Sequence, residues 1–205
     1  ETFTDPTTGA ERFLTHWKVI YPTEDPRLDP GTARVELTDH QRRGITRHII
    51  RNAIGQELGG TEYFLKGTPE ELTLATWTVR QGTGAERGQT FVTLTDRLRL
   101  GVTREITRNV LGQETQVQEF FEGTLISETV AIIYQPDGSS TVRWLERARP
   151  GFAREVHRDA FGRETRVTEY FLELEDGATP DPAAIIRPEN AVSTQTSYYA
   201  GERVD

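Results

Sequence analysis

Alternation of apolar and polar side chains over short segments predicts a protein built from β-strands. In residues 102–108 one face of the expected strand carries Val102, Arg104, Ile106 and Arg108, and the other carries Thr103, Glu105 and Thr107. A period of two residues is that of a strand. Residues 109–112 (Asn-Val-Leu-Gly) follow, and asparagine and glycine both favour tight turns. Because the next segment alternates again, this part of the chain predicts a β-hairpin.

The same hairpin pattern occurs three times. The first, second and third windows, residues 44–64, 101–121 and 151–171, align without a gap. Seven positions hold the same residue in all three windows, and three of them are the leading glycine (Gly44, Gly101, Gly151), the turn glycine (Gly55, Gly112, Gly162) and the final phenylalanine (Phe64, Phe121, Phe171). The other four are charged: Arg47, Arg51, Glu57 and Glu62; Arg104, Arg108, Glu114 and Glu119; Arg154, Arg158, Glu164 and Glu169. This agreement indicates an internal repeat.

A further hairpin precedes each window. Its strands are expected at 15–21 and 33–39, at 74–80 and 90–96, and at 129–135 and 141–147. Each unit then has four antiparallel strands, so three tandem units predict about twelve strands and no helix. The expected fold class is all-β. Because the strand faces mix charged and apolar residues, we favour an extended meander or rolled barrel, with a β-trefoil and a three-bladed propeller as alternatives.

The repeat divides the chain into five segments: an N-terminal arm (1–12), three repeats (13–67, 68–123 and 124–175) and a C-terminal arm (176–205). Residues 1–12 and 176–191 are rich in Thr, Pro, Gly and Asp, which predicts extended arms. Residues 192–199 alternate weakly and predict one more strand, a candidate for assembly through Val192, Thr194, Thr196 and Tyr198. This strand pairs either with its own sheet or with the sheet edge of a neighbouring molecule.

The repeated arginines and glutamates have two interpretations. In the first, they form cross-strand ladders that fix the register of the hairpins, with Arg104 and Glu119 as diagonal neighbours on one face. In the second, the arginines form a row that binds a carboxylate or phosphate polymer. Two arginines and two glutamates recur in each window, which favours the ladder because these repeated charges then neutralise each other.

The third window resembles a YD (RHS-type) repeat. Residues 159–163 read Asp-Ala-Phe-Gly-Arg and are followed by Thr165, Arg166 and Val167. YD repeats carry a Tyr-Asp-x-x-Gly-Arg core in a β-hairpin, and here Arg158 stands in place of the tyrosine. The resemblance covers about 15 residues in each unit. It implies extended β-sheet in bacterial surface or secreted proteins, and it implies no catalytic residues.

Composition narrows the class of protein. The 205 residues carry a net charge of −8, which disfavours a nucleic-acid partner because phosphate binding needs concentrated Lys and Arg. No run of apolar residues is long enough for a transmembrane helix. The chain has no Cys, which excludes disulfides and thiolate sites, and no Met. Because the first residue is Glu1, we expect that processing removed a secretory signal and that the protein is secreted, periplasmic or on the cell surface.

Few residues are candidates for chemistry. The four histidines lack metal-ligand spacing, and the catalytic and phosphate-loop motifs are missing from the sequence, so we expect no enzyme, cofactor or metal. Glu24, Asp25 and Asp29 are a weak calcium candidate in a loop stiffened by proline. The first functional hypothesis is a structural subunit, of a filament or surface layer, that joins copies of itself by exchanging terminal strands. The alternative is a monomeric binding module for a glycan, lipid or protein, with Trp17, Trp77 and Trp144 as stacking surfaces.

Overall fold

The computed structural model describes residues 2–4, 11–13, 15–39, 42, 44–175 and 178–197. The chain forms two compact units, Glu1–Arg104 and Glu105–Asp205. Among the described residues, no helix is long and apolar enough to cross a membrane.

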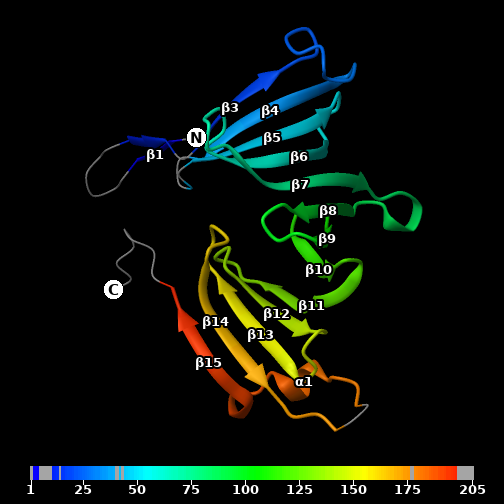
Figure 1. Ribbon diagram of the computed structural model, residues 1–205, viewed down its shortest axis with the longest axis vertical. Helices are drawn as coiled ribbons and strands as arrows, with labels where there is room; N and C mark the ends of the chain where they lie inside the picture. Colours follow the sequence, from blue (N-terminus) through cyan, green and yellow to red (C-terminus); the bar gives the residue numbers. More distant parts are fainter. Residues whose placement is uncertain are drawn as a thin grey trace. The chain divides into compact units, whose positions relative to one another are not determined.

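The fold is all-β, and thirteen antiparallel strands follow one another in a single open meander (Figure 1). The strands are β3 (Thr15–Ile20), β4 (Thr32–Asp39), β5 (Ile45–Asn52), β6 (Glu57–Phe64), β7 (Leu72–Gln81), β8 (Thr90–Asp96), β9 (Val102–Arg108), β10 (Glu114–Phe121), β11 (Thr124–Tyr134), β12 (Ser140–Glu146), β13 (Phe152–Arg158), β14 (Glu164–Phe171) and β15 (Ala191–Thr196). Two short strands, β1 (Thr2–Thr4) and β2 (Glu11–Phe13), pair separately. The strand order confirms the predicted meander, and it is not that of a closed barrel, a trefoil or a propeller. The grouping of strands in fours stays a prediction.

The three window hairpins share one turn chemistry. The side-chain oxygen Oδ1 of Asn52 accepts hydrogen bonds from the backbone N–H of Ile54 and Gln56. Asn109 and Asp159 make the equivalent pair of bonds in the second and third windows. The turn glycine of each window has φ near +80°, a conformation that glycine adopts without steric cost. The sequence therefore specifies each turn locally.

The register of the first and third windows differs from the diagonal arrangement that the sequence predicts for Arg104 and Glu119 in the second. In the first window the N–H of Asn52 donates to the carbonyl oxygen of Gln56 across the turn, and a β-bulge follows next to Arg51. Arg47 then lies directly opposite Glu62. The third window has the same bulge next to Arg158. Bulges of this kind are invisible to a period-two argument because they interrupt the period.

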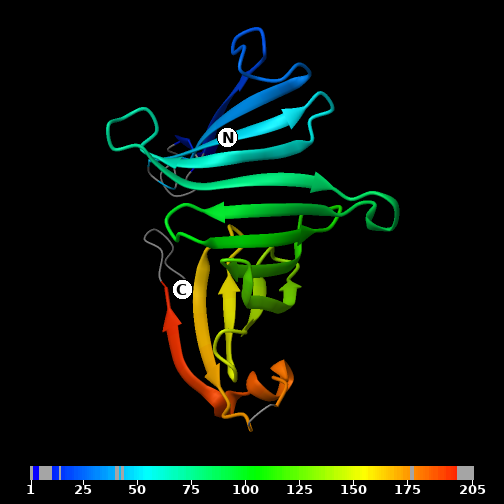
Figure 2. The same cartoon turned by 45° about the vertical axis from the view of Figure 1, so that its right-hand side comes forward.

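Strands β3 to β7 of the first unit lie side by side in one sheet (Figure 2), and the register of their residues gives its two faces different chemistry. Directly opposite residues share a face. One row across β3 to β7 consists of Val19, Val35, Ile49, Gly60 and Trp77. The neighbouring row on the other face consists of Lys18, Glu36, His48, Thr61 and Thr76. The apolar row therefore belongs to the same face as the arginine–glutamate pair of the first window.

The second unit has a small apolar core at one end of its sheet. Leu145 of β12, Ala153 of β13 and Tyr170 of β14 pack against Ile185, which is 0% exposed. Ile185 ends the short helix α1 (Pro182–Ile185), which packs against β13 (Figure 1).

The described part of the C-terminal arm differs from the expected extended chain. Within residues 178–197 it contains α1, a 3-10 turn (Pro188–Asn190) and β15. Asp181 caps α1 by accepting a bond of 3.0 Å from the N–H of Ala183, and Pro182 occupies the first turn. Aspartate before a helical proline is a helix-start signal, and one helical turn is too short to show a period.

Candidate functional site

Glu62 is the centre of the charged cluster of the first window. It accepts a hydrogen bond of 2.6 Å from Nε of Arg47 and bonds of 3.0 and 3.1 Å from the guanidinium of Arg42. The Glu62 side chain is 14% exposed. Burial alone raises the pKa of Glu62, but the bonds and charges of the two arginines outweigh burial and lower the pKa below its ordinary value. The cluster is therefore a charge-assisted cross-strand clamp.

The corresponding pair of the third window is arranged differently. Arg154 lies opposite Glu169, but its Nε is 3.4 Å from a carboxylate oxygen of Glu146 on β12. Glu169 instead accepts a bond of 2.8 Å from the hydroxyl of Ser193 on β15. Burial, together with the nearby charges of Glu119 and Glu169, raises the pKa of Glu146 despite Arg154. In the second unit the repeated glutamate, Glu169, therefore binds the last strand, β15, in place of its cross-strand arginine.

The outer charged pairs are looser. Arg108 lies 3.9 Å from Glu114, and Arg158 lies 3.9 Å from Glu164 and 3.7 Å from Glu114. Such distances permit ion pairing without direct hydrogen bonds. Of the remaining predicted ladder residues, Arg104 lies on β9 and Glu119 is buried on β10.

The first window departs from this pattern at Arg51 and Glu57. Although the two residues lie opposite each other, Glu57 accepts a hydrogen bond of 2.5 Å from the indole Nε1 of Trp77. Arg51 is exposed, and within the described part of the chain its guanidinium has no ion-pair or hydrogen-bond partner. The sequence did not reveal this exception, because the repeated arginines and glutamates are equal in number in every window.

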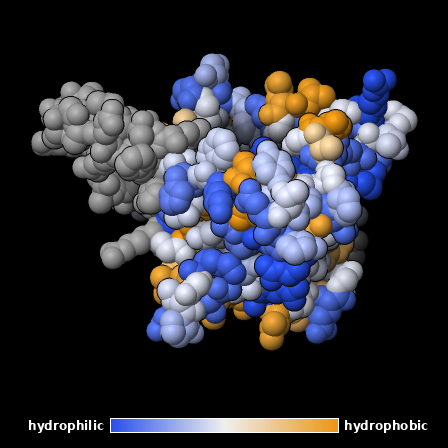
Figure 3. All heavy atoms as spheres, turned by 90° about the horizontal axis from the view of Figure 1, so that it is seen from above, coloured by the Kyte–Doolittle hydropathy of each residue, from blue (hydrophilic) through white to orange (hydrophobic). Residues whose placement is uncertain are grey.

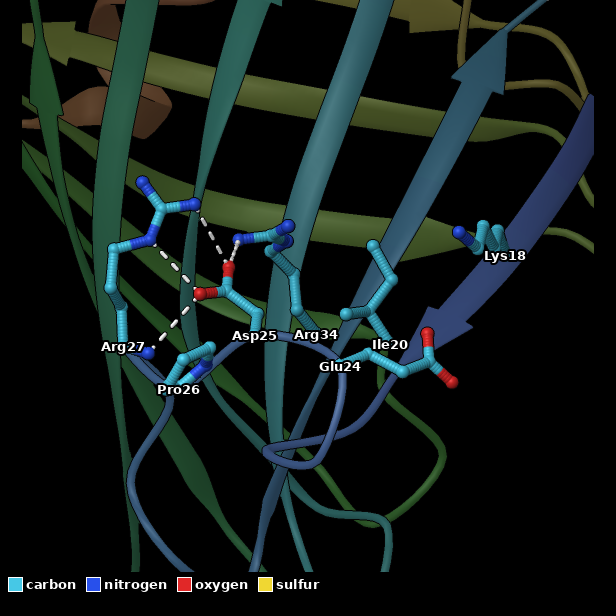
Figure 4. Close-up of a pocket in the computed structure, with 7 residues that line it drawn as sticks. All are labelled: Lys18, Ile20, Glu24, Asp25, Pro26, Arg27 and Arg34. Atoms are coloured by element: carbon cyan, nitrogen blue, oxygen red, sulfur yellow. Dashed lines mark hydrogen bonds and ion pairs between the residues drawn. The ribbon is translucent and has the colours of Figure 1, made fainter.

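A buried aspartate fixes the loop between β3 and β4 (Figure 4). Asp25 is 6% exposed and accepts bonds from the backbone N–H, Nε and Nη2 of Arg27, at 2.9 to 3.1 Å, and from Nη1 of Arg34 at 2.7 Å. The side-chain and backbone bonds from Arg27, with that from Arg34, hold the pKa of Asp25 far below its usual range. We call this arrangement the loop clamp.

The loop clamp bears on the calcium candidate. The carboxylate of Asp25 is directed at the two arginines, and Glu24 turns away from it in Figure 4. Across the described residues, no group of three or more acidic or histidine side chains is arranged to hold a metal ion. The hollow of about 490 Å³ beside the clamp is lined by both acidic and basic side chains.

The tryptophans do not share one environment. Trp144 is buried at 6% exposure, with the guanidinium of Arg154 5.2 Å from its ring centre, whereas Trp17 is 60% exposed on β3. Trp77 is half-buried and bonded to Glu57. On the side of the molecule seen in Figure 3, hydrophobic residues form small patches separated by polar ones. The sequence could not distinguish these environments, because all three tryptophans occupy strand positions.

The predicted assembly strand pairs with its own chain. β15 lies antiparallel to β14, with Thr194 opposite Thr168 and Thr196 opposite Arg166. It forms one end of the sheet order, and all six of its residues are exposed, Val192 by 57%. Val192 is also the extra residue of a bulge between Ala191 and Ser193. Tyr198 lies outside the described residues.

Comparison of the chain with protein-family models, with curated proteins and with solved structures found no match. The functional argument therefore depends on the geometry described above.

Proposed function

We propose that this protein is a non-enzymatic, exported structural protein whose copies associate through strand β15. The observation that carries the proposal is the chemistry of this edge, since β15 (Ala-Val-Ser-Thr-Gln-Thr) is fully exposed and has no charged residue. Soluble proteins usually protect an edge strand with charged side chains or proline, because its free backbone groups otherwise pair with another strand. In this proposal the three repeats, each a unit of four strands, supply the rest of the sheet.

The backbone of β15 is oriented for such pairing. The N–H of Ser197 donates to the carbonyl oxygen of Thr165 on β14. Because backbone groups of an antiparallel strand point alternately inward and outward, those of Gln195 and Ser193 also point toward β14. The N–H and C=O groups of Thr194 and Thr196 consequently point away from the sheet and are available to another strand.

The partner that fits this edge is a second copy of β15. Two copies related by a two-fold axis pair antiparallel, which continues the alternation of the sheet, and a two-fold axis is the commonest symmetry of protein dimers. The lack of charge on β15 also removes the like-charge repulsion that a self-pairing strand would otherwise meet. Association through the terminal arm, as the sequence suggests, then occurs by edge pairing while β15 stays on β14.

Replacement of one outward-facing residue tests the proposal. Thr194→Pro removes an N–H that the home sheet does not use, and proline is tolerated on an edge strand in this position. Thr194→Val is the matched control, because it keeps the N–H and, like proline, lacks the hydroxyl that lies 3.4 Å from that of Thr168.

Sedimentation velocity at about 1–100 µM is the measurement, a range that detects moderate dimer affinity. We expect the wild type and Thr194→Val to associate and Thr194→Pro to sediment as a monomer of 23.2 kDa. A wild-type chain that remains monomeric throughout this range contradicts the proposal. So does a Thr194→Pro variant that is folded by circular dichroism yet associates as strongly as the wild type.

A further inference from the structure

A second hollow lies at the hairpin of β3 and β4, on the face opposite the loop clamp. Its volume is about 470 Å³, within the range of small-molecule sites. Val19, Ala33 and Val35 provide apolar wall from the two strands. Tyr21, which is 55% exposed, and Arg51 of β5 also line it. Arg51 is the one charged residue among the described residues that line this hollow.

Arg51 is distinguished from its counterparts by the loss of its partner. Arg108 and Arg158 each lie 3.9 Å from the glutamate that matches Glu57 in their own windows. In the first window the carboxylate of Glu57 accepts the 2.5 Å bond from Trp77 and is drawn away from Arg51. The guanidinium of Arg51 therefore keeps its donors available at the hollow.

A sequence difference between the windows explains the position of Trp77. Gly60 stands where the second and third windows have Val117 and Val167. A Cβ atom on Gly60 would lie only 2.5 Å from Cζ2 of Trp77, so a valine there would collide with the indole ring. Gly60 thus makes room for the indole ring of Trp77, which donates a hydrogen bond to Glu57. Arg51 is therefore left without the ion pair that Arg108 and Arg158 form in the other windows.

We propose that this hollow binds a small organic carboxylate with an apolar aryl or alkyl body. A guanidinium pairs with a carboxylate through two parallel hydrogen bonds, and the apolar wall removes the rest of the ligand from water. One cation matches one negative charge, which favours a monocarboxylate over a phosphate. The inference is independent of assembly through β15, because Arg51 belongs to the first unit and β15 to the second.

Isothermal titration calorimetry with 4-phenylbutyrate tests this site, with the methyl ester as the neutral ligand control. Arg51→Gln removes the charge, and Arg108→Gln is the matched protein control because it changes the equivalent residue outside the hollow. We expect Arg51→Gln to weaken binding by about tenfold or more and Arg108→Gln to leave it unchanged, as loss of one charge-assisted contact implies. Binding of the ester with equal affinity overturns the proposal. Equal losses in the two variants, or no binding at about 10 mM ligand, overturn it as well.

A third variant tests the release of Arg51 without changing its charge. Trp77→Phe keeps an aromatic ring above Gly60 but removes the indole N–H that binds Glu57. The glutamate then becomes free to pair with Arg51 and to compete with the ligand. We expect a several-fold weaker affinity for 4-phenylbutyrate, by roughly threefold to tenfold. An unchanged affinity in a folded Trp77→Phe variant overturns the proposal that the Trp77–Glu57 hydrogen bond keeps Glu57 from pairing with Arg51.

The carboxylate has two sources, a free small acid or the end of a peptide chain. N-acetylphenylalanine and its amide distinguish them, since the acid mimics a chain terminus and the amide removes its charge. Tighter binding of N-acetylphenylalanine than of 4-phenylbutyrate assigns the site to a chain terminus, and weaker binding assigns it to a free acid. Equal binding of N-acetylphenylalanine and its amide overturns carboxylate recognition.

Discussion

Nε of Arg47 donates a hydrogen bond of 2.6 Å to the carboxylate of Glu62, directly across the strand pair β5–β6. The two residues recur in every window, but this arrangement does not. In the third window the residues at these positions lie opposite each other and bind different partners. The same repeated arginine and glutamate therefore make different contacts in different windows, and each window can be tested separately.

The first prediction concerns the stability contributed by Glu62. Glu62→Gln removes the charge but keeps the shape, and it leaves Arg42 and Arg47 without their shared carboxylate. Because the side chain is mostly buried, we expect the free energy of unfolding to fall by about 1–3 kcal/mol in urea titrations at pH 7.

Glu86→Gln is the control for this change. Glu86 also accepts a short hydrogen bond from an arginine, Arg80, but both side chains of that pair are about half exposed. Water screens such pairs, so we expect no measurable change in stability. Equal losses of unfolding free energy in Glu62→Gln and Glu86→Gln would show that burial does not set the strength of the interaction of Glu62 with Arg42 and Arg47.

The second prediction concerns pH, and it has opposite signs at two glutamates. The pKa of Glu62 is lowered in the folded protein from its ordinary value of 4.5, so its contribution is complete above pH 4.5 and is lost as pH falls below that. The pKa of Glu146 is raised, chiefly by burial, so its charging costs stability as pH rises from 4.5.

The corresponding variants should diverge with pH. Relative to the wild type, Glu62→Gln is expected to lose stability as pH rises from 3 to 7, and Glu146→Gln is expected to gain it. Thermal unfolding at a series of pH values measures both differences. A Glu146→Gln variant that is less stable than the wild type at pH 7 would mean that the ion pair with Arg154 outweighs the cost of burial.

Much of the fold follows from the sequence because its signals are local. Strands β8 and β9 begin and end where alternation places them, and the asparagine and glycine of each turn fix the hairpins. What sequence reasoning missed depends on contacts or on irregular backbone. α1 is held by burial of Ile185 against residues more than 10 positions away, and bulges next to Arg51 and Arg158 reset the register.

The candidate sites were less predictable than the fold. The sequence identifies Arg51 and Glu57 as repeated charges, and it contains the signal for their separation, since Gly60 replaces a valine. That signal gains meaning only when Trp77 is known to lie opposite Gly60. The loop clamp was missed for a related reason, because Asp25 was considered as an oxygen ligand and its arginine partners lie two and nine residues away.

The third prediction concerns the apolar core of the second unit. Ile185→Ala removes buried methyl and methylene groups from the contact with Leu145, Ala153 and Tyr170. We expect the free energy of unfolding to fall by about 2–5 kcal/mol, the usual range for truncation of a buried aliphatic side chain. Val192→Ala, at a site that is 57% exposed, is the control and should change stability little. A small loss in Ile185→Ala would indicate that α1 does not contribute to the core in solution.

The fourth prediction concerns the loop clamp. Asp25→Asn keeps the size of the side chain but removes the charge that attracts Arg27 and Arg34, and an amide nitrogen cannot accept their hydrogen bonds. We expect the loop to open more often, so that amide hydrogen exchange of Leu28 and Thr32, which donate bonds within the loop, becomes faster by about tenfold or more. Asp137→Asn is the control, because Asp137 accepts a backbone bond from Ser139 in a different turn, and an amide oxygen can still accept that bond. Exchange in the β3–β4 loop that is equally slow in wild type and Asp25→Asn would show that the backbone bonds of the loop suffice without the clamp.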